Sequence, residues 1–182
     1  MHSETLPQWN GKNSNAALLC GAASYLSLGS NVGDRVKTIE RAARELDALG
    51  EIQLCRLSGF YHTEPVGMES EAWFINCAAQ ITTTLSPLEL LDRLEELESS
   101  MGRKNKGHRE DRTLDIDILL YDDMIVSFPR LVIPHREMAN RRFVLEPLRE
   151  IAPDIIHPLL RKTTGQLFEL LESRAAVSRS DS

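Results

Sequence analysis

The sequence has few cysteines, and none of them lies in a paired spacing. Cys20, Cys55 and Cys77 are odd in number and far apart, which indicates neither a disulfide framework nor a Cys-x-x-Cys zinc site. No apolar run approaches the roughly 20 residues that span a bilayer. No basic segment leads into a signal-like hydrophobic stretch at the N-terminus. We therefore expect reduced thiols, a cytoplasmic location and no membrane partner.

Positive charge is also scarce. Lys and Arg total 21 against 27 Asp and Glu, which leaves a net charge of -6 and argues against nucleic acid as a general partner. The chain lacks the Gly-x-Ser-x-Gly and His-Glu-x-x-His patterns, and it has no Gly-x-x-x-x-Gly-Lys-Ser/Thr phosphate loop. A nucleotide, if one binds, must therefore be held by a local cluster of side chains together with a metal ion.

The length and composition predict one folded domain. The chain has 182 residues, of which 42% are hydrophobic, enough for a single substantial core. Residues 1–22 and 173–182 are polar and without a clear period, so we expect both to be disordered tails around a domain that spans 23–172. A monomer is expected.

The hydrophobic periodicity predicts an α+β protein. Ser86, Pro87 and Glu89 form a capping box with proline at the first helical position, which predicts a helix that Gly102 ends. Ile125-Val126 is expected to pair back on the strand before it as a hairpin. The predicted strands are 25–28, 52–61, 74–84 and 114–121, and the predicted helices are 36–49, 87–101, 136–140, 144–150 and 164–171. This order is typical of helices packed on one face of a mostly antiparallel sheet.

Two carboxylates share one face of the predicted strand 114–121. Asp115 and Asp117 are two residues apart, so their Cα atoms lie roughly 6.5–7 Å apart and their oxygens can converge on magnesium. A solvated strand face is the alternative reading of an isolated Asp-x-Asp. The surrounding basic residues favour a metal–nucleotide site, because arginine forks grip phosphate oxygens while carboxylates bind them through Mg²⁺. These residues are Arg103, Lys104, Lys106, His108, Arg109 and Arg112 before the strand, and Arg130, His135, Arg136, Arg141 and Arg142 after it.

Five motifs occur in an order that resembles the 6-hydroxymethyl-7,8-dihydropterin pyrophosphokinase family of folate biosynthesis. They cover most of the predicted domain, from about residue 23 to residue 171. The motifs are Leu28-Gly29-Ser30-Asn31, Thr63-Glu64-Pro65-Val66-Gly67, Phe74-Ile75-Asn76, Arg112-Thr113-Leu114-Asp115-Ile116-Asp117 and Ile133-Pro134-His135. The chain departs from the family at Arg109-Glu110-Asp111, where an aromatic residue followed by Gly-Pro is usual.

The resemblance implies a ferredoxin-like fold and transfer of the β,γ-diphosphate of ATP to the pterin hydroxymethyl group, with release of AMP. It implies two Mg²⁺ ions on Asp115 and Asp117, with Arg103 and Arg112 as further catalytic residues. The ATP-binding residues that it implies are Glu98, Arg112, Arg130, His135 and Arg141. The pterin-binding residues that it implies are Thr63, Val66, Phe74, Asn76 and Phe143.

Two alternatives belong to other functional classes. A metal-dependent nucleotidyltransferase also combines Gly-Ser with Asp-x-Asp, but there the two motifs lie a short helix apart, whereas Gly29-Ser30 precedes Asp115 by most of the domain. A non-catalytic nucleic-acid module could use the same kind of sheet. The negative net charge and the lack of an aromatic Lys/Arg-Gly-Phe/Tyr strand motif disfavour it.

Overall fold

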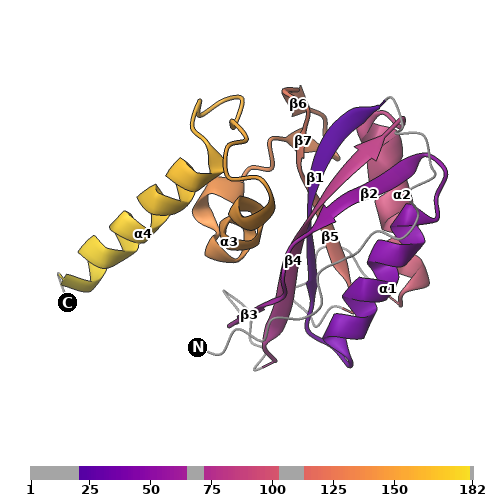
Figure 1. Ribbon diagram of the computed structural model, residues 1–182, viewed down its shortest axis with the longest axis horizontal. Coiled ribbons are helices and arrows are strands. Elements are labelled where there is room, and N and C mark those ends of the chain that lie inside the picture. The colour runs from indigo at the N-terminus through magenta and orange to yellow at the C-terminus, as the bar shows by residue number, and fades with distance from the viewer. Residues whose placement is uncertain (1–20, 65–71, 103–112, 181–182) are drawn as a thin grey trace.

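The computed structural model describes residues 21–64, 72–102 and 113–180, with side chains up to residue 172. The first half of the chain alternates strands and helices, and the last third is mainly helical (Figure 1). The elements are β1 (Ala22–Ser30), α1 (Arg35–Asp47), β2 (Ile52–Leu57), β3 (Tyr61–Thr63), β4 (Phe74–Thr83), α2 (Pro87–Ser100), β5 (Asp115–Tyr121), β6 (Val126–Ser127), β7 (Val132–Ile133), the 3-10 helix η1 (Met138–Asn140), α3 (Arg142–Ile151) and α4 (Thr164–Ser180).

The main sheet has the strand order β2-β4-β1-β5, and every pair of neighbours is antiparallel. β3 pairs with the N-terminal part of β4, beyond the stretch that pairs with β2. The chain forms two β-α-β units, β1-α1-β2 and β4-α2-β5. Each unit contributes one inner strand (β1 or β4) and one outer strand (β2 or β5), which is the ferredoxin-like arrangement. The predicted α+β class is therefore confirmed.

The two faces of the sheet are covered differently. Leu26 and Leu28 of β1 and Ile116 of β5 point to one face, where they form the main core with apolar side chains of α1 and α2 such as Ile39 and Leu94. The opposite face carries a second, smaller cluster, in which Tyr25 and Ala78 pack against Val144, Leu148 and Ile151 of α3. α1 and α2 thus lie on one side of the sheet and α3 on the other (Figure 1).

The helix ends follow the sequence signals. The side chain of Asp34 accepts a hydrogen bond from the backbone N–H of Lys37 at the start of α1. At the start of α2 both bonds of the predicted capping box are formed, between Ser86 and Glu89, and Pro87 occupies the first helical position. These side chains satisfy N–H groups that have no partner within the helix.

Several expectations from the sequence differ from the structure. The expectation that the helices lie on one face of the sheet is wrong, because α3 packs on the face opposite α1 and α2. The helix expected over 136–140 is a 3-10 helix over Met138–Asn140. The strand predicted over 52–61 is broken at 58–60 into β2 and β3. The hairpin predicted for Ile125-Val126 is wrong, because β6 pairs with β7 in a separate two-stranded sheet. α4 continues to Ser180, so the predicted end of the domain at residue 172 falls inside this helix.

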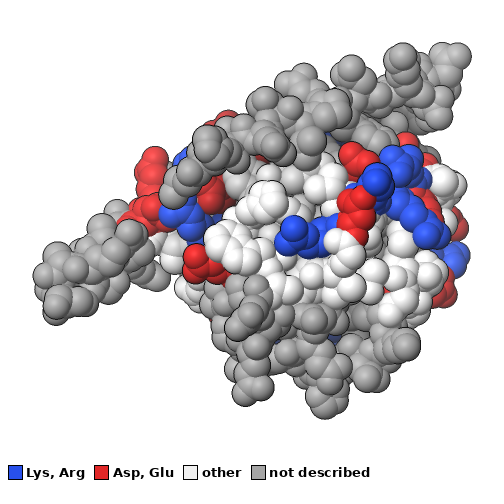
Figure 2. All heavy atoms as spheres, turned by 90° about the horizontal axis from the view of Figure 1, so that it is seen from below, with Lys and Arg blue, Asp and Glu red and all other residues white. Residues whose placement is uncertain are grey.

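The surface charges of the described residues are mixed. Figure 2 shows basic side chains lying beside acidic ones on the face it presents. Pairs along α1 are of this kind, with Arg41 Nε 2.7 Å from a carboxylate oxygen of Glu45. Within the described residues, no helix is long and apolar enough to cross a membrane.

Candidate active site

Asp115 and Asp117 lie on the α3 face of the sheet, as the alternation of β5 predicted. Their neighbours across β1 are Gly29 and Ser27, and the next strand, β4, places Asn76 and Ala78 in the same two rows. Both carboxylates are half-buried. Three of these four neighbours are small, so their side chains project little from the sheet beside the aspartates.

A polar pair lies about 10 Å from Asp115, two strand spacings across the sheet. The side-chain amide of Asn76 is buried and donates a hydrogen bond from Nδ2 to Thr63 Oγ1 at 2.6 Å. This bond directs the Asn76 carbonyl oxygen, Oδ1, toward β1. A Cβ atom on Gly29 would come within 2.8 Å of that oxygen, so a residue without a side chain is what allows this amide orientation.

Two aromatic rings belong to the same side of the sheet. Phe74 alternates with Asn76 along β4 and pairs with Thr63 of β3, which places it on the α3 face. Phe143 stands in the first turn of α3, partly buried against the smaller core, and the Arg141 guanidinium lies 5.8 Å from its ring centroid. Both rings therefore belong to the side of the sheet that carries the aspartates and Asn76.

His135 lies close to the aspartates. Its backbone N–H donates to the carbonyl of Leu119, two residues after Asp117 on β5, at 2.9 Å. Burial lowers the pKa of His135, the carboxylates of Asp117 and Asp115 act in the opposite direction, and the Arg141 guanidinium lowers it further. A lowered pKa favours the neutral imidazole, which can accept a hydrogen bond or donate one at neutral pH.

Glu98 is placed differently from the other predicted site residues. Its side chain comes from α2 and is buried, with 1% of its surface exposed. Its Oε1 accepts the backbone N–H of Ile116, the residue between the two aspartates, at 2.6 Å. The observed contact of Glu98 is therefore with strand β5, and its predicted contact with the nucleoside stays a prediction.

Arg130 is held by α2. Its Nη2 lies 2.8 Å from a carboxylate oxygen of Asp92 and 2.9 Å from one of Glu95. The side chain is more than half exposed, so both ion pairs are open to water and weak. To make the predicted contact with ATP, the Arg130 guanidinium would have to leave Asp92 and Glu95 or bind phosphate and carboxylate oxygens at the same time.

Three predicted residues fall outside the described part of the chain. Arg103, Arg112 and Val66 belong to 65–71 and 103–112. The structure brings the remaining candidates to one face of the sheet, apart from Glu98 and Arg130. The residues that the sequence reasoning did not select are Ser27 and Gly29, although Gly29 belonged to one of the quoted motifs.

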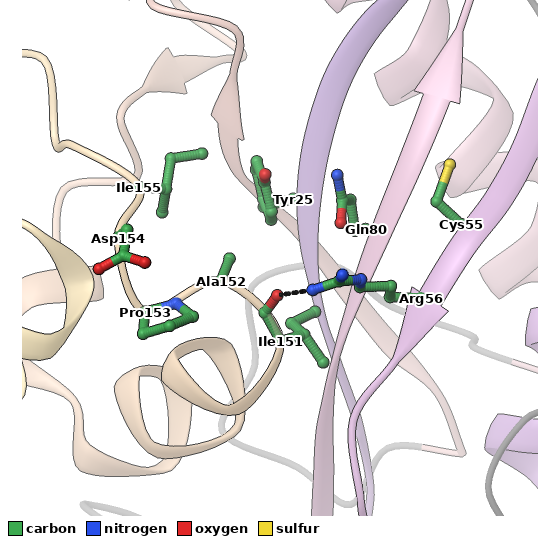
Figure 3. Close-up of a pocket in the computed structure, with 9 residues that line it drawn as sticks. All are labelled: Tyr25, Cys55, Arg56, Gln80, Ile151, Ala152, Pro153, Asp154 and Ile155. Carbon is green, nitrogen blue, oxygen red and sulfur yellow. Dashed lines mark hydrogen bonds between the residues drawn. The ribbon is translucent and has the colours of Figure 1, made fainter.

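A separate hollow of about 540 Å³ lies on the same face, between β2, β4, β1 and the end of α3 (Figure 3). Its walls include Tyr25, Arg56, Gln80 and Asp154. No predicted site residue within the described part of the chain lines it. Arg56 donates a hydrogen bond to the carbonyl of Ile151 at its edge, at 2.8 Å, and this contact ties the end of α3 to the sheet.

Comparison with known sequences gives one consistent match. The sequence model of the 7,8-dihydro-6-hydroxymethylpterin-pyrophosphokinase family matches residues 25–153. A 2-amino-4-hydroxy-6-hydroxymethyldihydropteridine pyrophosphokinase of Haemophilus influenzae is 42% identical over 135 residues, which cover 74% of this chain and 84% of the relative. The protein of the same name from Aquifex aeolicus is 40% identical over 78% of this chain and 87% of its own length.

Other relatives are longer proteins. The bifunctional protein FolKE of Lactococcus lactis is 44% identical over 70% of this chain, but the match covers only 37% of FolKE. Among solved structures, the Plasmodium falciparum HPPK-DHPS with pteroate superposes with a TM-score of 0.69 over 84% of this chain and 43% of that chain, at 17% identity. The likeness to that structure concerns the fold alone.

Proposed function

This chain belongs to the 7,8-dihydro-6-hydroxymethylpterin-pyrophosphokinase family and is an enzyme of folate biosynthesis that transfers a pyrophosphoryl group from ATP to hydroxymethyldihydropterin, and we propose how its residues divide the work. The α3 face of the sheet has a carboxylate side, around Asp115 and Asp117, and an amide side, around Asn76. The first would bind the nucleotide phosphates, and the second would bind the pterin ring.

Asp115 and Asp117 are the candidates for holding magnesium. Within the described residues no group of three His, Cys, Asp or Glu side chains could hold a metal ion. Two carboxylates nevertheless fit Mg²⁺, because this ion keeps several waters and takes substrate phosphate oxygens as ligands. We propose two ions, which when bound would neutralise phosphate charge and orient the attacking and leaving oxygens.

The basic residues would bind the triphosphate. The His135 imidazole feels the charges of both Asp117 and Arg141, which supports a proposed role for His135 and Arg141 in contacting phosphate oxygens beside the carboxylates. Arg103, Arg112 and Arg130 complete the proposed set, and Glu98 is proposed at the nucleoside end. Arginine suits this task because its planar fork binds two phosphate oxygens and remains charged throughout.

The amide side has the chemistry of a pterin pocket. A flat heteroaromatic ring presents donors and acceptors at its edge and apolar faces above and below. Asn76, fixed by Thr63 at 2.6 Å, offers an oriented carboxamide for the edge. Phe74 and Phe143 offer rings for the faces, and Val66 is proposed to join them.

In the proposed transfer the pterin hydroxymethyl oxygen attacks the β-phosphorus of ATP in line with the bond to the α-phosphate oxygen. That bond breaks, AMP leaves with the bonding electrons, and the hydroxyl proton passes to solvent. The chain contributes by holding the two reactants in register on one rigid sheet. We also propose that the enzyme works as a monomer in the cytoplasm.

The observation that carries these assignments is the common sheet face of Asp115, Asp117 and Asn76. The test is AMP formation from Mg-ATP with and without 6-hydroxymethyl-7,8-dihydropterin, in the wild type and in Asp115→Ala and Asp117→Ala. We expect pterin-dependent AMP in the wild type and a loss of at least about 100-fold in kcat in each variant. Near-normal turnover in a folded variant would overturn the proposed metal site.

A further inference from the structure

The break between β2 and β3 lies next to the proposed pterin pocket. At this break the Ser58 hydroxyl replaces part of the strand ladder: Oγ accepts the backbone N–H of Ala78 at 2.9 Å and donates to the carbonyl of Gly59 at 2.8 Å. Gly59 and Phe60 therefore leave the ladder with β4. The chain rejoins it at Tyr61, opposite Asn76.

A carboxylate from α3 accepts the backbone donor that the break sets free, together with a side-chain hydroxyl of β3. Glu150 accepts the backbone N–H of Gly59, with both carboxylate oxygens 3.1 Å from that nitrogen. Its Oε2 also accepts the hydroxyl of Tyr61 at 2.7 Å. Hydrogen bonds to an ionised acceptor are stronger than those between neutral groups. One side chain thus holds the middle residue of the connection 58–60 and the first residue of β3.

The connection determines where β3 lies. β3 has only three residues, of which Tyr61 pairs with Asn76 and Thr63 with Phe74. Thr63 Oγ1 is the acceptor that orients the Asn76 amide. A shift of β3 would therefore move this acceptor away from Asn76, while the aspartates, on the far side of β1, would keep their places.

We propose that Glu150 is a positioning residue for the pterin side of the site, a role that rests on the proposed function of Asn76 and Thr63. Its carboxylate sets the start of β3 and thereby the orientation of the Asn76 amide. Glu150 also stands seven residues, two helical turns, after Phe143. α3 therefore carries Phe143, one proposed side of the pterin pocket, and also contacts β3, the strand that carries Thr63.

The attachment of α3 to the sheet does not depend on Glu150 alone. Arg56 of β2 donates to the carbonyl of Ile151 at 2.8 Å, and Val144, Leu148 and Ile151 are buried against the sheet. Figure 3 shows the Arg56 guanidinium directed at that carbonyl. Loss of the Glu150 carboxylate should therefore release the connection at 58–60 while α3 stays docked.

The test compares Glu150→Ala with Tyr61→Phe, which removes only one of the hydrogen bonds. We expect Glu150→Ala to raise KM for the pterin about tenfold and to change KM for Mg-ATP by less than about twofold. Tyr61→Phe should raise KM for the pterin by a smaller factor, about threefold. The double variant should resemble Glu150→Ala, because both changes remove one network.

Glu45→Ala is the control, because Glu45 is a partly exposed helix carboxylate that pairs with Arg41 and lies on α1, on the other side of the sheet. It should leave both KM values unchanged. Amide hydrogen exchange of residues 59–63 should be faster in Glu150→Ala than in Glu45→Ala. This readout needs no catalysis, so it tests the contact even if the wild type forms no pterin-dependent AMP, which would overturn the proposed function instead. Equal rises in both KM values, or an unchanged KM for the pterin in folded Glu150→Ala, would overturn the positioning role.

Discussion

At the scale of single residues, Gly29 separates the two halves of the site. It lies between Asp115 on β5 and Asn76 on β4 in one row across the sheet. The nearest atom to an added Cβ is the Asn76 side-chain oxygen at 2.8 Å, whereas the nearest backbone atom, the carbonyl oxygen of Ile75, is 4.0 Å away. An alanine here would therefore displace a side chain that can move rather than the strand itself.

We predict that Gly29→Ala impairs pterin binding more than it impairs folding. The displaced Asn76 amide should raise KM for the pterin about tenfold, equivalent to about 1.4 kcal/mol. The free energy of unfolding should change by less than about 1 kcal/mol, because β1 accommodates alanine. Steady-state kinetics and urea unfolding measure the two effects.

Gly50→Ala is the control for this prediction, because a Cβ at Gly50 meets nothing within 4 Å. It should leave KM for the pterin unchanged. If Gly29→Ala and Gly50→Ala have the same KM, the close approach of Gly29 to Asn76 has no functional role.

At the scale of elements, β5 is the outer strand that carries the metal candidates. Its pairing partner is β1 on one side, so its other edge presents backbone donors that need acceptors. Glu98 of α2 supplies one acceptor for Ile116 at 2.6 Å in a buried position. α2 therefore fixes the strand at the residue between Asp115 and Asp117.

We predict that Glu98→Ala destabilises the protein and reduces kcat/KM, because the buried N–H of Ile116 loses its acceptor. The expected loss in the free energy of unfolding is about 1–3 kcal/mol. Glu98→Gln keeps a side-chain oxygen of the same reach and should lose less than half as much. Urea unfolding and AMP formation measure both variants.

The same pair of variants separates two roles of Glu98. A rise in KM for Mg-ATP in Glu98→Gln, without loss of stability, would support the nucleotide contact that the sequence suggested. Equal destabilisation by Gln and Ala would contradict the importance of the hydrogen bond to β5.

At the scale of the whole molecule, the segment between α3 and α4 contains a buried titratable group. Burial lowers the pKa of His157, and its Nδ1 accepts the backbone N–H of Leu160 at 3.2 Å. The folded state therefore binds fewer protons on this residue than the unfolded chain does. The contribution of His157 to the free energy of unfolding is present above the unfolded pKa of about 6.5. It is lost as the pH falls through the lower pKa of the folded state.

We predict that the free energy of unfolding falls when the pH is lowered from 7 to 5, and that His157→Asn reduces this fall. Asparagine keeps an acceptor near the position of Nδ1 but does not titrate. Urea unfolding at a series of pH values gives the slope for each protein. Parallel slopes in the wild type and in the variant would show that His157 contributes nothing to the pH dependence.

The sequence by itself determined the local elements and the identity of the acidic pair. Capping and hydrophobic periodicity act over a few residues, so the Ser86 capping box and the alternation that puts Asp115 and Asp117 on one face could be read directly. The ordered motifs carried the resemblance to the family, which the comparisons with relatives confirm. The roles of individual site residues stay predictions.

Only the tertiary structure decided which distant residues meet. The Ser58-Gly59 pair is a local turn signal within the strand predicted over 52–61, but the acceptor that holds the break is Glu150, 91 residues beyond Gly59. The closeness of Gly29 to Asn76 likewise depends on the register of β1 against β4. Strand register and helix docking are set by burial summed over the whole sheet, which no short segment contains.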